Sequence, residues 1–109
     1  MKDEYILVVT TFSDRNAAKS CGEELLKRHL VACCQITEIE SMYRWKGQIE
    51  NDKEYKVEMK TKKVFFQEIK KFITDIHSYD IPEIVVYKII DGSESYMQWI
   101  EDELKILKE

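Results

Sequence analysis

The chain has 109 residues, of which 44% are hydrophobic and 35% are charged, and this length and balance fit one domain, residues 1–109, with a single core. Three glycines and one proline are too few for a linker-rich or disordered chain. The formal net charge of −4 argues against a general nucleic-acid binder, which needs a basic face to release counterions.

The first part of the sequence predicts a strand followed by a helix. Residues 5–11 form a continuous run rich in β-branched side chains, which is typical of a strand buried on both faces. Ser13 or Asp14 then offers a helix N-cap. Apolar residues recur at helical spacing to about residue 30, namely Ala18, Cys21, Leu25 and Leu26.

The middle of the sequence predicts a long β-hairpin. Residues 31–46 contain no glycine or proline and we expect them to be extended. Gly47 opens a polar connection through Asn51 and Asp52, which is a hairpin signal. Residues 54–61 then alternate between apolar or small and charged side chains, as a strand with one buried face does.

The last part predicts a helix, a strand and a terminal helix. Residues 65–76 carry apolar side chains at helical offsets, and residues 77–82 end this helix because Pro82 disfavours helix at the preceding residue. Residues 83–90 are a second buried strand, and residues 91–93 turn the chain. The terminal helix is lined by Tyr96, Ile100, Leu104 and Leu107.

The predicted element order is βαββαβ with a final helix. This split βαβ pattern predicts an α+β ferredoxin-like sandwich with an extra C-terminal helix. In such a sandwich two helices cover one face of a four-stranded antiparallel sheet.

The predicted hairpin is too long for the layer that should cover it. Residues 32–46 would span roughly 45–50 Å, whereas helices of about 14 residues reach about 21 Å. An isolated ribbon is marginal in water, and it would expose Ile39, Tyr43 and Trp45 beside unpaired strand edges. We therefore expect the ribbon to pair with another subunit. The alternative is a strand that bends at a bulge and folds back on its own domain.

The three cysteines predict a reducing compartment. Cys21, Cys33 and Cys34 are odd in number and lack the spacing of a disulfide framework, and adjacent cysteines on a strand point to opposite faces. Residues 1–5 are charged, and no apolar run approaches the ~20 residues that cross a bilayer. We expect a cytoplasmic protein without a membrane partner.

Five short motifs follow one another along the chain: A-C-C-Q-I at 32–36, S-M-Y-R-W-K-G at 41–47, K-T at 60–61, H-S-Y-D-I-P-E-I at 77–84 and Y-M-Q-W-I at 96–100. Together they resemble the CutA family of divalent-cation tolerance proteins, in register from about residue 5 to residue 99. The resemblance implies a tightly packed homotrimer with strand pairing between subunits, a likeness to PII signalling proteins, and a link to copper and other divalent metals.

The sequence departs from the family pattern at several positions. The family's A-C-V-N-I reads A-C-C-Q-I here, so Cys34 is an extra thiol and Gln35 replaces an asparagine. Some bacterial members carry a cysteine at the end of the first strand and a second histidine before the His-Pro pair, where this chain has Thr10 and Ile76. A copper site built from those groups does not carry over intact, because only His77 remains.

His77, Cys33 and Cys34 are the candidate metal ligands. A neutral imidazole suits copper or zinc. The alternative is that His77 is a capping or packing residue, because histidine is also favoured at a helix C-terminus. The cysteines are soft ligands without an accompanying C-x-x-C or Cys/His array, and free cysteines are commonly buried packing residues. A site built from all three needs them to meet across a subunit boundary.

The resemblance also implies a ligand cleft between neighbouring subunits, formed by Lys60, Glu54, Tyr79, Glu83, Tyr96 and Trp99. Lys60 would neutralise a small anionic ligand and the rings would provide flat walls. The alternative is a cross-strand ion-pair face combined with aromatic core packing. Tyr43 and Trp45 are expected to be trimer interface anchors rather than a ligand cage.

These observations predict a non-enzymatic homotrimer that functions in divalent-cation tolerance and binds copper or a similar ion. No P-loop, dinucleotide fingerprint, zinc-protease motif or nucleophile elbow occurs, and residues 54–60 do not match the RNA-binding stretch of similar folds. The alternative is a PII-like signalling or scaffold trimer that holds a small anionic ligand in the intersubunit cleft.

Overall fold

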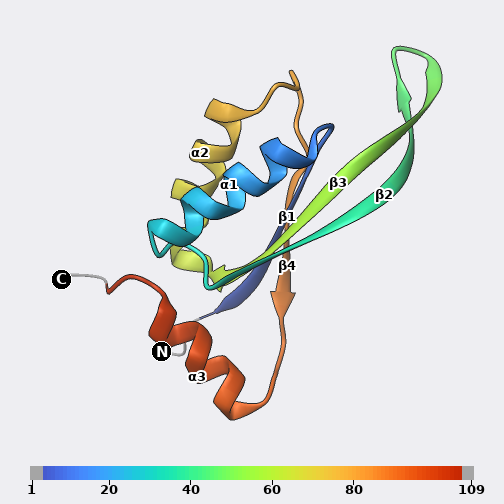
Figure 1. Ribbon diagram of the computed structural model, residues 1–109. Helices are drawn as coiled ribbons and strands as arrows, with labels where there is room; N and C mark the ends of the chain where they lie inside the picture. The colour runs from blue at the N-terminus through green and yellow to red at the C-terminus, as the bar shows by residue number, and fades with distance from the viewer. Residues whose placement is uncertain (1–3, 107–109) are drawn as a thin grey trace.

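The computed structural model describes residues 4–106, and it shows a four-stranded antiparallel sheet with the strand order β2-β3-β1-β4. Figure 1 shows two helices, α1 and α2, on one face of this sheet and a third helix, α3, at one end of it. The order of elements and of strands is that of the predicted ferredoxin-like sandwich. The predicted terminal-helix residue Leu107 lies outside the described residues.

The strand β1 (Tyr5–Phe12) is one of the two central strands, paired with β3 on one side and with β4 on the other. The helix α1 (Arg15–Lys27) follows it directly, because the Asp14 carboxylate accepts a hydrogen bond of 3.0 Å from the backbone N–H of Ala17 and so caps the first turn. The helix ends at Lys27, three residues earlier than predicted, because His29 takes the left-handed conformation (φ 57°).

The core lies between the sheet and the two covering helices. The 3-10 turn Lys63–Phe65 leads into α2 (Phe66–Ile76), and β4 (Ile84–Ile89) completes the sheet. Side chains from every layer are fully buried there, among them Val8, Leu25, Val57, Met59, Ile69 and Ile73. Burial of such side chains is the main favourable term that holds the layers together.

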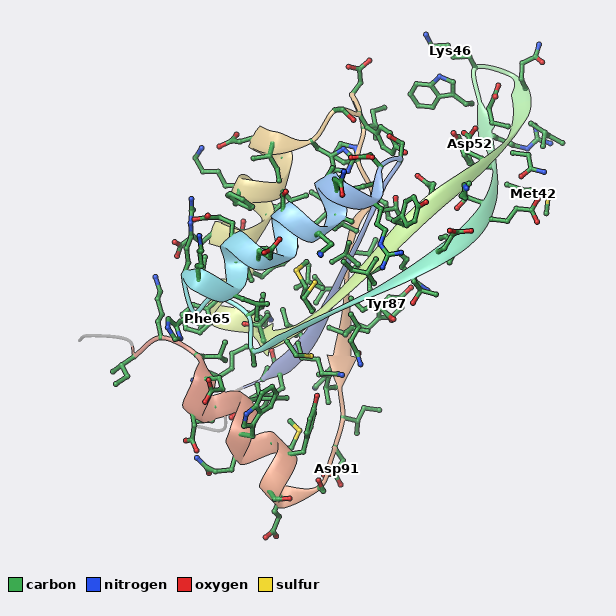
Figure 2. All side chains as sticks on the ribbon, viewed as in Figure 1. Met42, Lys46, Asp52, Phe65, Tyr87 and Asp91 are labelled. Carbon is green, nitrogen blue, oxygen red and sulfur yellow. The ribbon has the colours of Figure 1, made fainter. Side chains whose placement is uncertain are left out.

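The hairpin of β2 (Cys33–Trp45) and β3 (Gln48–Lys62) runs far past the rest of the sheet. The strand β1 stops pairing with β3 at Tyr55, so residues 39–54 form a free two-stranded ribbon about 23 Å long, which we call the arm. Figure 2 shows Met42, Lys46 and Asp52 on the arm, far from Phe65 under the helices. The predicted overlong hairpin is confirmed, and Met42 and Ile49 are more than 70% exposed on it.

The turn at the tip of the arm differs from the prediction. Only Lys46 and Gly47 connect the strands, with φ values of 49° and 79°. Positive φ at both central residues defines the two-residue turn whose twist matches a hairpin. The predicted polar connection through Asn51 and Asp52 is therefore wrong, because these residues already pair with β2.

The helix α3 (Glu94–Glu103) is anchored at the opposite end of the sheet. Its Ile100 is fully buried, and its Glu101 pairs with the Lys62 ammonium at 2.9 Å and accepts a hydrogen bond of 2.7 Å from the Tyr5 hydroxyl. Leu104 is buried too, but in extended backbone beyond the helix. Across residues 4–106, no helix has the length and apolar character required to cross a membrane.

Candidate functional site

The three predicted metal ligands lie in three different environments. Cys33 and Cys34 are opposite Lys60 and Met59 of β3, and neighbouring residues on a strand face opposite sides of the sheet. His77 follows α2, at the end of β1 where Thr11 and Phe12 lie. Within one chain these donors do not come together.

Both ring nitrogens of His77 have backbone partners. Its Nε2–H donates to the Thr11 carbonyl at 2.6 Å, and its Nδ1 accepts from the Tyr79 backbone N–H at 3.1 Å. These partners require the neutral tautomer protonated at Nε2. The ring also stacks on Phe12, with centroids 4.4 Å apart. A metal ion at His77 would have to displace one of these bonds.

Cys34 is packed between the sheet and α1. Burial, reinforced by the charge of Cys33, raises the pKa of the Cys34 thiol to about 11, and burial beside Cys34 raises the pKa of Cys21 to about 12. Because the thiolate is the form that binds metals, neither thiol is a ready ligand at neutral pH. Among residues 4–106, no three His, Cys, Asp or Glu side chains are grouped so that they hold an ion.

Cys33 lies in a basic and aromatic cluster on the open face of the sheet. The Lys60 ammonium is 3.8 Å from the Cys33 sulfur, 3.1 Å from the Gln35 amide oxygen and 5.5 Å from the Tyr96 ring centroid. Tyr96 stacks on Trp99. Burial acts to lower the pKa of the Lys60 ammonium, but its hydrogen bonds and charge interactions with Tyr96 and Cys33 outweigh burial. The pKa of Lys60 is therefore raised above its ordinary value.

A cleft of about 640 Å³ opens where the arm leaves the sheet, between the arm and the loop before β4. Four acidic residues are among those that line it, namely Glu40, Glu54, Asp80 and Glu83. Its aromatic walls are Tyr43, Trp45 and Tyr79. We call this the acidic cleft. Its volume is within the range of small-molecule sites.

Glu54 is the most buried carboxylate of the acidic cleft. Its side chain accepts a hydrogen bond of 2.9 Å from the Tyr79 hydroxyl, and the residue is only 7% exposed. On the arm, the Tyr43 hydroxyl donates to the Asp52 carboxylate. Burial and the bond to Glu54 raise the pKa of Tyr79 to about 12, and the bond to Asp52 raises the pKa of Tyr43 to about 12.

The predicted ligand cleft therefore falls into two groups within one chain. Glu54, Tyr79 and Glu83 meet in the acidic cleft, whereas Lys60 lies with Tyr96 and Trp99. Glu54 and Lys60 are six residues apart on β3, which is about 20 Å. The sequence prediction did not include Glu40 and Asp80 as lining residues. The signal available in the sequence was that both segments that border the cleft carry acidic residues. The hairpin carries Glu40 and Glu54, and the loop before β4 carries Asp80 and Glu83.

Comparison with known proteins gives consistent matches over nearly the whole chain. Residues 6–103 match the family described as CutA1 divalent ion tolerance protein. The divalent-cation tolerance protein CutA of Pyrococcus horikoshii is 38% identical over 100 residues, covering 92% of this chain and 98% of that protein. The protein of the same name from Thermotoga maritima is 35% identical over 97 residues, covering 89% and 96%.

Solved structures agree with this match. The crystal structure of CutA1 from Pyrococcus horikoshii has a TM-score of 0.87 at 37% identity and covers 93% of this chain and 99% of its own. The structure titled periplasmic divalent cation tolerance protein CutA, from Archaeoglobus fulgidus, has a TM-score of 0.90 at 28% identity, with the same coverage of 93% and 99%.

Proposed function

Because the chain belongs to the CutA1 divalent ion tolerance family, we propose that it functions in divalent-cation tolerance as a non-enzymatic homotrimer that binds divalent metal ions. The observation that carries this proposal is the match over residues 6–103, which spans the arm and the sheet together. The relatives are named for ion tolerance and not for a reaction, which supports a role without catalysis.

The arm supports the homotrimer. It presents Tyr43 and Trp45, each about 40% exposed, on one face, with the half-buried Ile39 at its base. Apolar side chains on β4 are exposed as well, among them Val85 and Tyr87. Such surfaces are typical of interfaces. Light scattering at micromolar concentration should give three times the mass of one chain, and a strict monomer would contradict the proposal.

The metal site belongs, in our proposal, at a subunit boundary. The donors of one chain do not converge, and Cys33 lies beside Lys60 on the open face of the sheet, whereas Cys34 packs against Gly22 of α1. A soft thiolate suits copper or zinc. Calorimetry with Cu(II) and Zn(II) should show saturable binding that Cys33→Ala weakens at least about tenfold. Equal binding by wild type and His77→Ala would remove His77 as a ligand, and no binding by wild type would contradict the metal-binding part.

No observation favours the alternative of a small anionic ligand held by Lys60 in the intersubunit cleft, because the charged lining of the acidic cleft is entirely carboxylate and Lys60 lies outside it, beside Gln35 and Tyr96. We retain a reducing, cytoplasmic setting as part of the proposal, supported by three free cysteines. Fractionation of the native cells with an antibody against the chain tests the location, and recovery from an extracytoplasmic fraction would contradict it.

A further inference from the structure

We propose that Asp91 is a modification site, at which the main chain isomerises from the ordinary aspartyl linkage to the β-linkage of isoaspartate. This inference goes beyond the proposed function, because it concerns neither metal ions nor assembly. Asp91 lies in the exposed connection 90–93 between β4 and α3 and is followed by Gly92. Figure 2 shows Asp91 at the opposite end of the molecule from Lys46 at the tip of the arm.

The Asp91 carboxylate is folded onto the peptide bond that follows it. Its Oδ1 accepts a hydrogen bond of 2.8 Å from the Gly92 backbone N–H. Because Cγ is bonded directly to Oδ1, the Gly92 nitrogen and the carbon that it must attack are already held close together. Such proximity lowers a reaction barrier, because the entropy of bringing the two groups together has been lost in advance.

The proposed step is an intramolecular condensation. From the protonated carboxyl form, the Gly92 nitrogen forms a bond to Asp91 Cγ and gives up its proton, and the carboxyl hydroxyl leaves, so that one water molecule is released. The product is a cyclic imide, the succinimide. Water then adds to either ring carbonyl and breaks its bond to nitrogen. Cleavage at the main-chain carbonyl gives isoaspartate and cleavage at Cγ restores aspartate, so no oxidant, reductant or cofactor is consumed.

The residue that follows Asp91 distinguishes it from the other aspartates. It is the one aspartate in the sequence that precedes a glycine, and glycine has no Cβ atom to hinder the approach of its nitrogen to Cγ. Asp80 is also exposed and outside the helices and strands, but the β-branched Ile81 follows it. Asp52 and Asp75 lie within β3 and α2, where the regular backbone restricts the rotation that ring closure needs.

Isomerisation at Asp91 lengthens the connection to α3. An isoaspartyl linkage carries Cβ in the main chain and so adds one carbon–carbon bond, about 1.5 Å. Both sides of the connection are anchored at Tyr5, which pairs with Ile89 of β4 and donates its hydroxyl to Glu101 of α3. The added bond must therefore be accommodated between these anchors, in the connection itself or in the first turns of α3.

The first turns of α3 have little free space to accommodate it. A Cβ atom added at Gly92 would lie 2.8 Å from the Met97 sulfur, so the connection packs closely on this helix. Tyr96 precedes Met97, and its ring centroid is 5.5 Å from the Lys60 ammonium while the ring stacks on Trp99. A shift of this turn loosens both contacts of Tyr96, so isoaspartate at residue 91 disturbs the basic and aromatic cluster on the open face of the sheet.

The test is prolonged incubation of the native assembly at neutral pH and physiological temperature. Peptide mapping with electron-transfer dissociation distinguishes isoaspartate from aspartate at each position. We expect isoaspartate to accumulate with time at Asp91, at least about tenfold faster than at the exposed Asp80. Methylation by an isoaspartate O-methyltransferase with labelled S-adenosylmethionine should report the same amount.

Three variants test the proposed step. Asp91→Glu keeps the charge, but its longer side chain closes a ring less readily, so isomerisation should fall at least about tenfold. Asp91→Asn forms the same succinimide with loss of ammonia and should give isoaspartate at least about tenfold faster than wild type. Gly92→Ala places a Cβ atom beside the attacking nitrogen and should slow the step about fivefold, and the flexible Met97 side chain can move to make room.

The effect on α3 is measured by hydrogen exchange after the isoaspartyl and aspartyl fractions of the incubated protein are separated by chromatography. Amides of residues 94–103 should exchange at least about twofold faster in the isoaspartyl fraction, whereas those of residues 5–12 should be unchanged. Equal exchange of α3 in both fractions would overturn its displacement.

The modification site itself is overturned by three results. These are no isoaspartate at Asp91 in wild type, equal accumulation at Asp80, or no acceleration in Asp91→Asn. An assembly that covers the connection would produce the first and the last. Metal binding and the mass in solution are measured separately, so failure here does not bear on the proposed function.

Discussion

At the scale of single residues, Gly22 of α1 packs directly against Cys34 of β2. A Cβ atom added at Gly22 would lie 2.4 Å from the Cys34 sulfur, a distance that no packed pair tolerates. Gly22→Ala should therefore destabilise the fold by about 1–3 kcal/mol, even though alanine favours helix by about 1 kcal/mol. Chemical denaturation measures the difference.

The cause of that loss can be isolated in a second background. In a Cys34→Ala variant the sulfur is absent and only the Cβ of residue 34, at 3.2 Å, opposes the added methyl group, so Gly22→Ala should cost at least about 1 kcal/mol less than in wild type. Equal losses in both backgrounds would show that the clash is not with Cys34.

Tyr79 gives the fold a pH dependence in the alkaline range. Burial and the bond to Glu54 raise its pKa from 10.0 to about 12, so the folded state holds the phenolic proton more tightly than the unfolded chain does. The resulting stabilisation is complete below pH 10 and is lost as the pH rises towards 12. The free energy of unfolding should fall more steeply over this range in wild type than in Tyr79→Phe.

The matched control for this prediction is Tyr87→Phe, because Tyr87 is 59% exposed on β4. Its pH profile of stability should follow that of wild type. A Tyr79→Phe profile that also matched wild type would contradict the role of the Tyr79 hydroxyl.

At the scale of elements, the tip of the arm carries a correctable strain. Lys46 has a φ of 49°, and the left-handed region costs a residue with a Cβ atom roughly 1–2 kcal/mol, less for asparagine. Lys46→Asn creates the Asn-Gly pair that this turn type prefers. We expect a gain of roughly 0.5 kcal/mol, measured by thermal or chemical unfolding. Lys53→Asn, within the paired strand, should give no gain, and a loss in Lys46→Asn would contradict the turn assignment.

The strands and helices were predictable because their patterns reflect the buried face of the sheet. The alternation at 54–61 and the apolar face of α2 both arise from contact with one core. Residues 48–52 have no such face, because the arm is exposed on both sides. An exposed strand can carry polar side chains without a cost in stability. The composition of residues 48–52 is therefore the same as that of a polar loop, and the sequence alone did not distinguish the two. The glycine in the pair Lys46-Gly47 was the informative signal.

The sequence indicated which residues to consider for the candidate site, but it did not indicate which of them lie together within one chain. Glu54, Tyr79 and Glu83 were expected together and do line one cleft. Lys60 was expected with them because the family resemblance implies one cleft between neighbouring subunits, but within one chain Lys60 lies six residues from Glu54 along β3, about 20 Å away. The hydrogen bonds to both ring nitrogens of His77 form because the loop after α2 lies against the end of β1. This tertiary contact cannot be predicted from the spacing of residues in the sequence.

At the scale of the whole molecule, the arm makes assembly testable by mutation. If Tyr43 and Trp45 anchor a trimer, replacing both with alanine should shift the mass in light scattering towards one chain at micromolar concentration, because buried aromatic anchors carry much of the energy of an interface. Ile49→Ala is the control, because Ile49 is 73% exposed and pairs with Arg44 on the other face of the arm. Its mass should equal that of wild type, and unchanged mass in the double variant would exclude these anchors.

The position of β1 between β3 and β4 has a consequence for how the chain is made. The ribosome produces β1 first, and β3 covers one of its edges once residues 55–62 have emerged. The other edge waits for β4, whose last residue is 27 positions after the end of β3, an interval of roughly 1–5 s at ordinary rates of synthesis. During that interval an apolar strand edge is open to other nascent chains. A product truncated before Ile84 keeps that edge open permanently.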